Sequence, residues 1–151
     1  MKIKILIFFI PLFFIAISCE GQNKKPKNSE TKNKKMEEKN PNENKQISAL
    51  KNSMLEYMEM SNPAYSKNDV EECEKILYEY ISEISNSKSK DEGMKIVKNT
   101  VEKLNKLNVK CNSQLIETSE REQIAEIIIK ESSKKGYNKP EEDITENWRE
   151  W

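Results

Sequence analysis

Between Ile47 and Ile128, apolar residues recur every three or four positions in four separate segments. This spacing places them on one face of an α-helix, whereas a half-buried β-strand needs strict alternation. The four apolar stripes consist of Ile47, Leu50, Met54, Leu55 and Met58; of Val70, Cys73, Leu77, Tyr80, Ile81 and Ile84; of Met94, Val97, Val101, Leu104 and Leu107; and of Ile124, Ile127 and Ile128. The sequence therefore predicts four consecutive amphipathic helices.

Capping and helix-breaking residues indicate where these helices begin and end. Asn62-Pro63 ends the first segment, and Gly136 is the predicted C′ residue of the fourth. The predicted starts are Asn68 with Glu71 three residues on, the capping box from Ser89 to Glu92, and the segment from Ser119 to Glu122. Because a short connection joins the second and third helices, we expect an antiparallel hairpin whose apolar stripe the other helices cover.

The predicted fold class is therefore all-α, a small bundle of about four helices that forms one domain over residues 47–151. Near the C-terminus, Thr145 is placed to cap a short helical turn. Ile144, Trp148 and Trp151 are then expected to fold back on the bundle, because large apolar side chains gain most from burial.

The first nineteen residues have the pattern of an export signal. Lys2 and Lys4 precede the apolar run Ile5–Ile17, which suits the core of a signal peptide and is too short for a comfortable membrane span. The run ends in Ala16-Ile17-Ser18-Cys19, which resembles the lipobox of bacterial lipoproteins, with Ala16 in place of the commoner Leu. This resemblance implies that residues 1–18 are removed and that the thiol of Cys19 carries a diacylglycerol. The alternatives are an uncleaved anchor helix and an ordinary signal peptide that leaves a free cysteine.

Residues 19–46 are predicted to be a disordered linker. After Cys19, Met36 is its only sizeable apolar residue, and such a segment cannot offset its ordering entropy by burial. The linker holds 8 basic and 5 acidic residues, whereas Ile47–Trp151 holds 16 basic and 21 acidic ones. The expected arrangement is an acidic domain on a basic tether, anchored to a membrane of the cell envelope on its periplasmic or surface side.

Two scarce residue types exclude several kinds of chemistry. The chain has no histidine, which excludes Ser/His and Cys/His nucleophilic pairs and histidine-ligated zinc or haem. Its three glycines, Gly21, Gly93 and Gly136, are too far apart for a phosphate-binding loop. The balance of 26 basic and 26 acidic residues gives no positive excess for nucleic acid. We therefore predict no catalytic residue, no metal site, no cofactor and no nucleic-acid partner.

Cys73 and Cys111 are the cysteines that remain once Cys19 is lipidated, and they are candidates for a disulfide. An oxidising compartment favours pairing, and the open ends of an antiparallel helical hairpin are neighbours. The alternative is a pair of buried thiols, and the sequence leaves both open.

Three acidic clusters raise the question of catalysis: Glu71-Glu72, Glu120 with Glu122, and Glu141-Glu142-Asp143. Paired carboxylates can act in acid–base chemistry. Carboxylates at helix starts also complement the helix dipole without any chemistry, and this structural role is the favoured one.

A few large side chains are candidates for an interaction surface. Met60 and Tyr78 lie off the apolar stripes. Trp148 and Trp151 are included as well, although packing of the tail on the core is their favoured role.

From about Asp69 onward the chain resembles a group of small, uncharacterised bacterial helical proteins. The resemblance is carried by Leu115-Ile116-Glu117-Thr118 and by the ending Asp143-Ile144-Thr145 with Trp148-Arg149-Glu150-Trp151. It implies one structural unit and transfers no catalytic residue.

The leading functional hypothesis is a non-enzymatic domain that binds an unknown envelope protein while anchored through Cys19. A sharper version is an immunity-type protein that neutralises a toxin. The alternatives are an enzyme that uses carboxylates or lysine, and a structural or envelope-stress lipoprotein.

Overall fold

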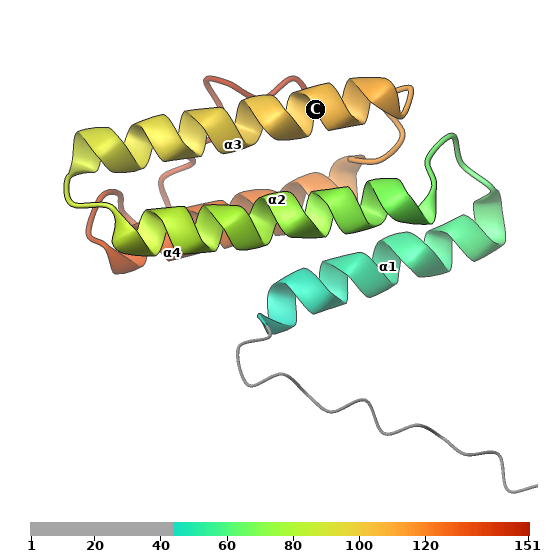
Figure 1. Ribbon diagram of the computed structural model, residues 1–151, viewed down its shortest axis with the longest axis horizontal. Helices are drawn as coiled ribbons and strands as arrows, with labels where there is room; N and C mark the ends of the chain where they lie inside the picture. The colour runs from blue at the N-terminus through green and yellow to red at the C-terminus, as the bar shows by residue number, and fades with distance from the viewer. Residues whose placement is uncertain (1–43) are drawn as a thin grey trace, which may run out of the picture. The chain divides into compact units, whose positions relative to one another are not determined.

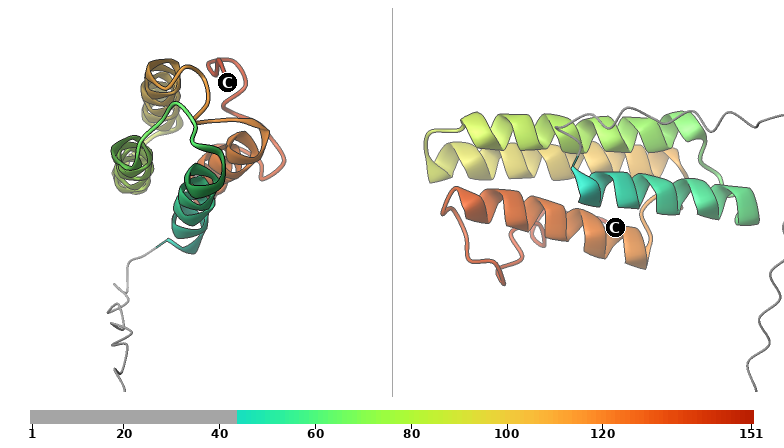
Figure 2. Two further views of the ribbon diagram at one scale, coloured as in Figure 1. Left: turned by 90° about the vertical axis from the view of Figure 1, so that its right-hand side faces the viewer. Right: turned by 90° about the horizontal axis from the view of Figure 1, so that it is seen from below.

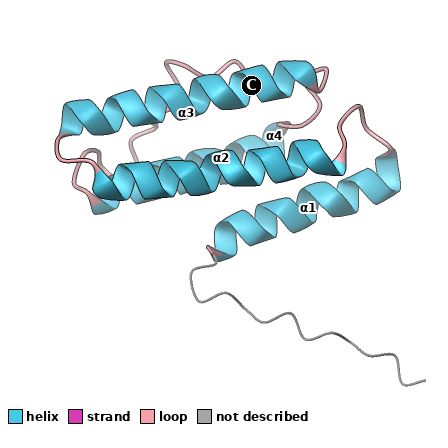
Figure 3. Cartoon of the chain, in the orientation of Figure 1, coloured by secondary structure: helices cyan, strands magenta, loops and turns pink. Residues whose placement is uncertain are grey.

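The structure is a computed structural model that describes residues 44–151. Within this range the chain forms α1 (Lys45–Ser61), α2 (Lys67–Asn86), α3 (Lys90–Lys110) and α4 (Thr118–Lys134), with no strand (Figure 3). The predicted all-α fold with four helices is confirmed. The predicted signal peptide, the lipidation site Cys19 and the linker up to residue 43 lie outside the described residues.

Successive helices run antiparallel, and α2 is the central element (Figures 1 and 2). It packs against α1, α3 and α4, and α1 also packs against α4. Their facing stripes form one core, whose fully buried side chains include Ile47, Leu77, Tyr80, Leu104, Ile124 and Ile128. The Tyr80 hydroxyl donates a hydrogen bond of 2.7 Å to the Ile128 carbonyl, so this large polar side chain is satisfied inside the core.

The C-terminal tail, residues 135–151, covers the side of the core that α3 and α4 leave open (Figure 2, left). Ile144 is buried, and both tryptophans are half-buried against the core. The tail contains two hydrogen-bonded turns: the Glu142 amide donates to the Lys139 carbonyl, and the Trp148 and Arg149 amides donate to the Thr145 carbonyl. Burial of these apolar side chains is therefore what draws the tail onto the helices.

Two helix starts differ from the predicted ones. The N-cap of α2 is Ser66 and not Asn68, because the Ser66 amide and hydroxyl both donate to the Asp69 carboxylate, at 2.8 and 2.6 Å. The N-cap of α4 is Glu117 and not Ser119, and the Glu117 amide donates to the Glu120 carboxylate. In both cases an acid three residues after the cap completes the capping box.

Helix α1 begins at Lys45, within the segment predicted as linker. The Asn44 side chain accepts hydrogen bonds from the Gln46 and Ile47 amides, which caps the helix. The Gln46 side chain then contacts Glu126 and Lys130 of α4. This polar contact adds a first turn that the apolar spacing alone did not predict.

Helix α4 ends at Lys134, and Gly136 is its C′ residue, as predicted. Gly136 has φ = 72°, and its amide donates to the Ser133 carbonyl while the Tyr137 amide donates to Ser132. This is the Schellman arrangement, in which a left-handed residue reverses the chain. It directs the Tyr137 ring across Gly93 of α3, where the Tyr137 and Ser87 hydroxyls lie 3.1 Å apart.

Replacing Gly93 with alanine is expected to destabilise the domain by about 1–2 kcal/mol, because overpacking outweighs the gain in helix propensity. A Cβ atom at this position would lie 2.5 Å from Cδ2 of Tyr137. Chemical denaturation measures the loss. In a Tyr137→Leu background the same change should become neutral or stabilising, and an equal loss in both backgrounds would contradict this explanation.

Candidate interaction groove

A groove with a volume of about 620 Å³ lies between α4 and the C-terminal tail. We call it the α4–tail groove. One wall consists of residues spaced along one face of α4: Arg121, Glu122, Ala125, Glu126, Ile129, Lys130 and Ser133. The other wall consists of Pro140, Asp143 and Arg149. The lining thus combines three apolar residues with six charged ones, a mixture that can bind another protein.

The tail wall is held in place by a buried asparagine on α3. The Asn105 amide nitrogen donates to the Trp148 carbonyl at 2.8 Å, and its oxygen accepts from the Glu150 amide at 3.2 Å. Asn105 thereby satisfies two backbone polar groups of the tail, which has no regular secondary structure to satisfy them. The groove is therefore preformed by contacts within the domain.

Asp143 and Arg149 fix the tail from within. Their side chains form an ion pair of 2.8 Å, and Arg149 also lies over the Trp151 ring, 5.8 Å from its centre. Partial burial alone would raise the pKa of Asp143, but hydrogen bonds from the Thr145 hydroxyl and amide, together with Arg149, lower it below its usual value. Asp143 is therefore ionised at neutral pH, and its role is to hold the tail in place through the ion pair with Arg149.

The remaining charged groups of the groove are available to a partner. Within residues 44–151, Glu122 makes no ion pair, and Glu126 accepts a hydrogen bond only from the neutral Gln46 side chain. Arg121 has one long contact, 3.4 Å, with the Thr118 hydroxyl. Because these side chains are half-exposed or exposed, pairing them with a charged group of a partner costs little desolvation free energy.

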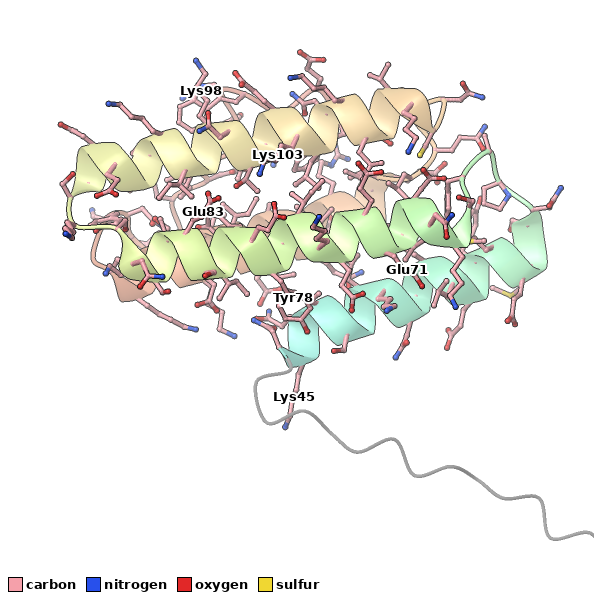
Figure 4. The ribbon with its side chains drawn as sticks, viewed as in Figure 1. Lys45, Glu71, Tyr78, Glu83, Lys98 and Lys103 are labelled. Atoms are coloured by element: carbon pink, nitrogen blue, oxygen red, sulfur yellow. The ribbon has the colours of Figure 1, made fainter. Side chains whose placement is uncertain are left out.

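A second groove, of about 350 Å³, lies between α2 and α3. Both carboxylates that line it are paired with lysines of the same groove: Lys103 Nζ lies 3.2 Å from Glu79 Oε2, and Lys110 Nζ lies 3.1 Å from Glu72 Oε2. Figure 4 views this side of the domain, with Lys103 on α3. Because its own ion pairs occupy this groove, it offers a partner less than the α4–tail groove does.

The structure does not bring together the four side chains predicted as an interaction surface. Met60, at the end of α1, is 79 % exposed. Tyr78 is half-buried at the seam between α2 and the start of α1 (Figure 4). Trp148 and Trp151 belong to the tail and pack on the core.

Cys73 and Cys111 are both free and fully buried in this structure. Cys73 lies on α2, and Cys111 is the C-cap of α3. Burial, together with the nearby Cys111, raises the pKa of the Cys73 thiol to about 12. Both thiols are therefore inert as nucleophiles while the domain is folded. A disulfide between them stays a prediction.

Of the three acidic clusters, only Glu120 lies in the first turn of a helix, whereas Glu71 and Glu72 follow the first turn of α2 and residues 141–143 lie in the tail, outside any helix. The helix-dipole role predicted for the clusters is therefore wrong for most of them. The carboxyl groups with displaced pKa values are displaced downward. These groups are Asp69, Glu79 and Asp143. A general acid at neutral pH needs a raised pKa, so these carboxylates serve as ion-pair and capping partners. Among residues 44–151, no three cysteine, aspartate or glutamate side chains converge as they would around a metal ion.

Asp69 predicts a specific loss of stability in acid. Hydrogen bonds from the Ser66 hydroxyl, from Lys110 and from the Ser66 amide lower its pKa to about 2. Because the folded pKa is depressed, the stabilisation is complete above the unfolded value of 3.8 and is lost as the pH falls through about 2. The Asp69→Asn variant should therefore melt at a lower temperature than the parent at pH 7, and the two melting temperatures should converge near pH 2. A constant difference across this range would contradict the assignment.

The apolar spacing did not predict the α4–tail groove, although one feature of the sequence pointed to it. Arg121 and Arg149 are the only arginines of the chain, against 24 lysines, and both line this groove. Arginine suits partly buried and bidentate contacts better than lysine does. The two arginines therefore indicate positions where such contacts are made.

None of the four helices in the described range has the length and hydropathy that crossing a membrane requires. No protein-family model, curated protein or solved structure matches this chain.

Proposed function

We propose that this protein is a bacterial lipoprotein, anchored through Cys19, whose helical domain binds another envelope protein in the α4–tail groove without catalysing a reaction. The observation that carries the proposal is the preformed groove itself. Its tail wall is fixed by Asn105 and by the Asp143–Arg149 ion pair, so a partner finds the site already ordered. Preorganisation of this kind lowers the entropic cost of binding.

The anchor is supported by the apolar run and the small residues before Cys19, in the order typical of a lipobox. Acyl chains on one cysteine hold a domain at the bilayer, because each buried methylene contributes about 0.8 kcal/mol. A linker of residues 19–43 then gives the groove a search radius of tens of ångströms, on the order expected for a random coil. Immunity against a toxin is a special case of this function, in which the partner is the toxin.

Site-specific photocrosslinking in the native producer tests the proposal. A photoreactive residue at Ser133, in the groove wall, should yield a discrete adduct with a membrane or envelope protein. The matched control places the same residue at Glu83, an exposed position on α2 that makes no ion pair with any other described residue (Figure 4). Adducts from Glu83 as strong as those from Ser133, or none from either, would contradict the proposal.

A further inference from the structure

The end of the C-terminal tail, residues 143–151, is hydrogen-bonded mainly to itself. The Asp143 carboxylate accepts from the Thr145 amide and hydroxyl, at 2.9 and 2.6 Å, and forms the 2.8 Å ion pair with Arg149. The Trp148 and Arg149 amides donate to the Thr145 carbonyl. All of these partners belong to the same short segment, so the segment keeps them wherever it lies. We call residues 143–151 the tail unit.

Within the described domain, one side chain supplies all the hydrogen bonds between the tail unit and the helices. The Asn105 side chain donates to the Trp148 carbonyl and accepts from the Glu150 amide. The remaining contacts are apolar, because Ile144 is buried and Trp148 and Trp151 are half-buried against the core. We call the surface under the tail unit, with Asn105, its seat. The tail unit lies on this seat as a bound peptide would, through backbone hydrogen bonds and apolar side chains.

The segment that joins the tail unit to the bundle, residues 138–142, has the properties of a hinge. Its turn is closed by two exposed local hydrogen bonds, from the Glu142 amide to the Lys139 carbonyl at 3.1 Å and from the Lys139 amide to the Glu142 carboxylate at 3.2 Å. Water replaces such exposed bonds at little cost. The side-chain oxygen of Asn138 is buried and has no hydrogen-bond partner in the described domain. Opening the hinge hydrates this oxygen, which favours the extended form.

We propose that the tail unit exchanges between two copies of this chain: the hinge extends, and the tail unit of each copy occupies the seat of the other. The contacts in the exchanged pair are the same as those within one copy, so the seat already fits this occupant. The tail wall of the α4–tail groove then comes from the second copy, which contributes Asp143 and Arg149. A partner that binds this groove therefore contacts both copies at once.

Complementation between two full-length variants in detergent tests the exchange. Asn105→Ala removes the hydrogen bonds of the seat and keeps both tryptophans of the chain, so its emission should lie at longer wavelength than that of the parent. Trp148→Ala/Trp151→Ala keeps Asn105 and contains no tryptophan. Mixing the two should move the emission back toward the parent wavelength, because the tail unit of the first copy enters the seat of the second. The shift should saturate as the second variant is added.

The matched control adds Asn105→Ala to the tryptophan-free variant, so that neither copy has an intact seat, and mixing should then leave the emission unchanged. Circular dichroism checks that each variant keeps the helical content of the parent. A mixture whose emission equals that of the first variant alone, or an equal shift with the control, would overturn the exchange. Binding of a labelled peptide of residues 143–151 to the tryptophan-free variant, without a shift in the mixture, would also reject a second copy as the occupant.

A second variant leaves both the seat and the tail unit intact. Deleting residues 139–142 removes the turn that brings the tail unit back to its own seat. This variant should elute as a dimer in size-exclusion chromatography and keep the emission of the parent. A monomer with emission at longer wavelength would contradict the exchange, and it would leave the binding of an envelope protein by the parent chain to be decided by crosslinking from Ser133.

Discussion

Replacing Asn105 with alanine should release the C-terminal tail from the bundle and cost about 2 kcal/mol of unfolding free energy, since two hydrogen bonds to partly buried backbone groups are lost. The side chain donates to the Trp148 carbonyl and accepts from the Glu150 amide, and it is itself only 7 % exposed. Both tryptophans of the chain lie in this tail. Their fluorescence therefore reports the release directly, as a shift of the emission to longer wavelength before the helices unfold.

The matched control is Asn99→Ala, on the exposed side of the same helix. It should leave both the emission and the stability unchanged. Because the tail forms one wall of the α4–tail groove, Asn105→Ala should also abolish crosslinking from Ser133. An Asn105→Ala variant with the parent emission spectrum would show that the tail is held by other contacts.

Replacing Asn108 with alanine should have a larger effect on global stability, about 3 kcal/mol. The Asn108 side-chain oxygen accepts from the Leu115 amide at 3.1 Å and from the Ile116 amide at 2.9 Å, and all of these groups are buried. Removing the acceptor leaves two buried donors without partners, each costing about 1–3 kcal/mol. Denaturant unfolding followed by circular dichroism measures the loss.

An Asn108→Asp variant separates the lost acceptor from the lost volume. Aspartate keeps an oxygen in place, so this variant should retain more stability than Asn108→Ala, despite the cost of burying a charge near neutral pH. If both variants lose the same stability, the two hydrogen bonds to the α3–α4 connection do not account for the effect.

The helical part of the fold could be predicted because the apolar stripes carry it. Residues such as Ile47, Leu77, Leu104 and Ile128 recur at helical spacing and are fully buried. The same reasoning could not predict the burial of Asn105 and Asn108, because spacing arguments treat polar side chains as exposed. Their role depends on backbone groups far along the chain, which no local pattern encodes.

The helix starts show a similar limit. Ser66 with Asp69 and Asn68 with Glu71 both match the capping-box pattern, and two residues separate the predicted start from the observed one. Asp69 accepts from the Ser66 amide and hydroxyl, and Lys110 Nζ, at the end of α3, lies 2.9 Å from the same carboxylate. A contact between helices therefore supports the observed cap, and no local pattern encodes it.

The α4–tail groove was beyond prediction for a further reason. Its two walls are separate segments, and the Schellman turn at Gly136 and the ring of Tyr137 on Gly93 direct the second wall past the first. The turn was predicted, but the path of the tail after it was not. Only the placement of both arginines gave a hint in the sequence.

Intact-protein mass spectrometry of the membrane fraction from the native producer tests the central claim, that a lipid on Cys19 holds this binding domain at a membrane. If Cys19 is lipidated and the signal peptide is removed, the mature chain begins at Cys19 and carries the added mass of acyl groups. The Cys19→Ala variant should lack this mass. An unmodified full-length chain in the parent strain would contradict the account, because the groove would then have no anchor to bring it to an envelope partner.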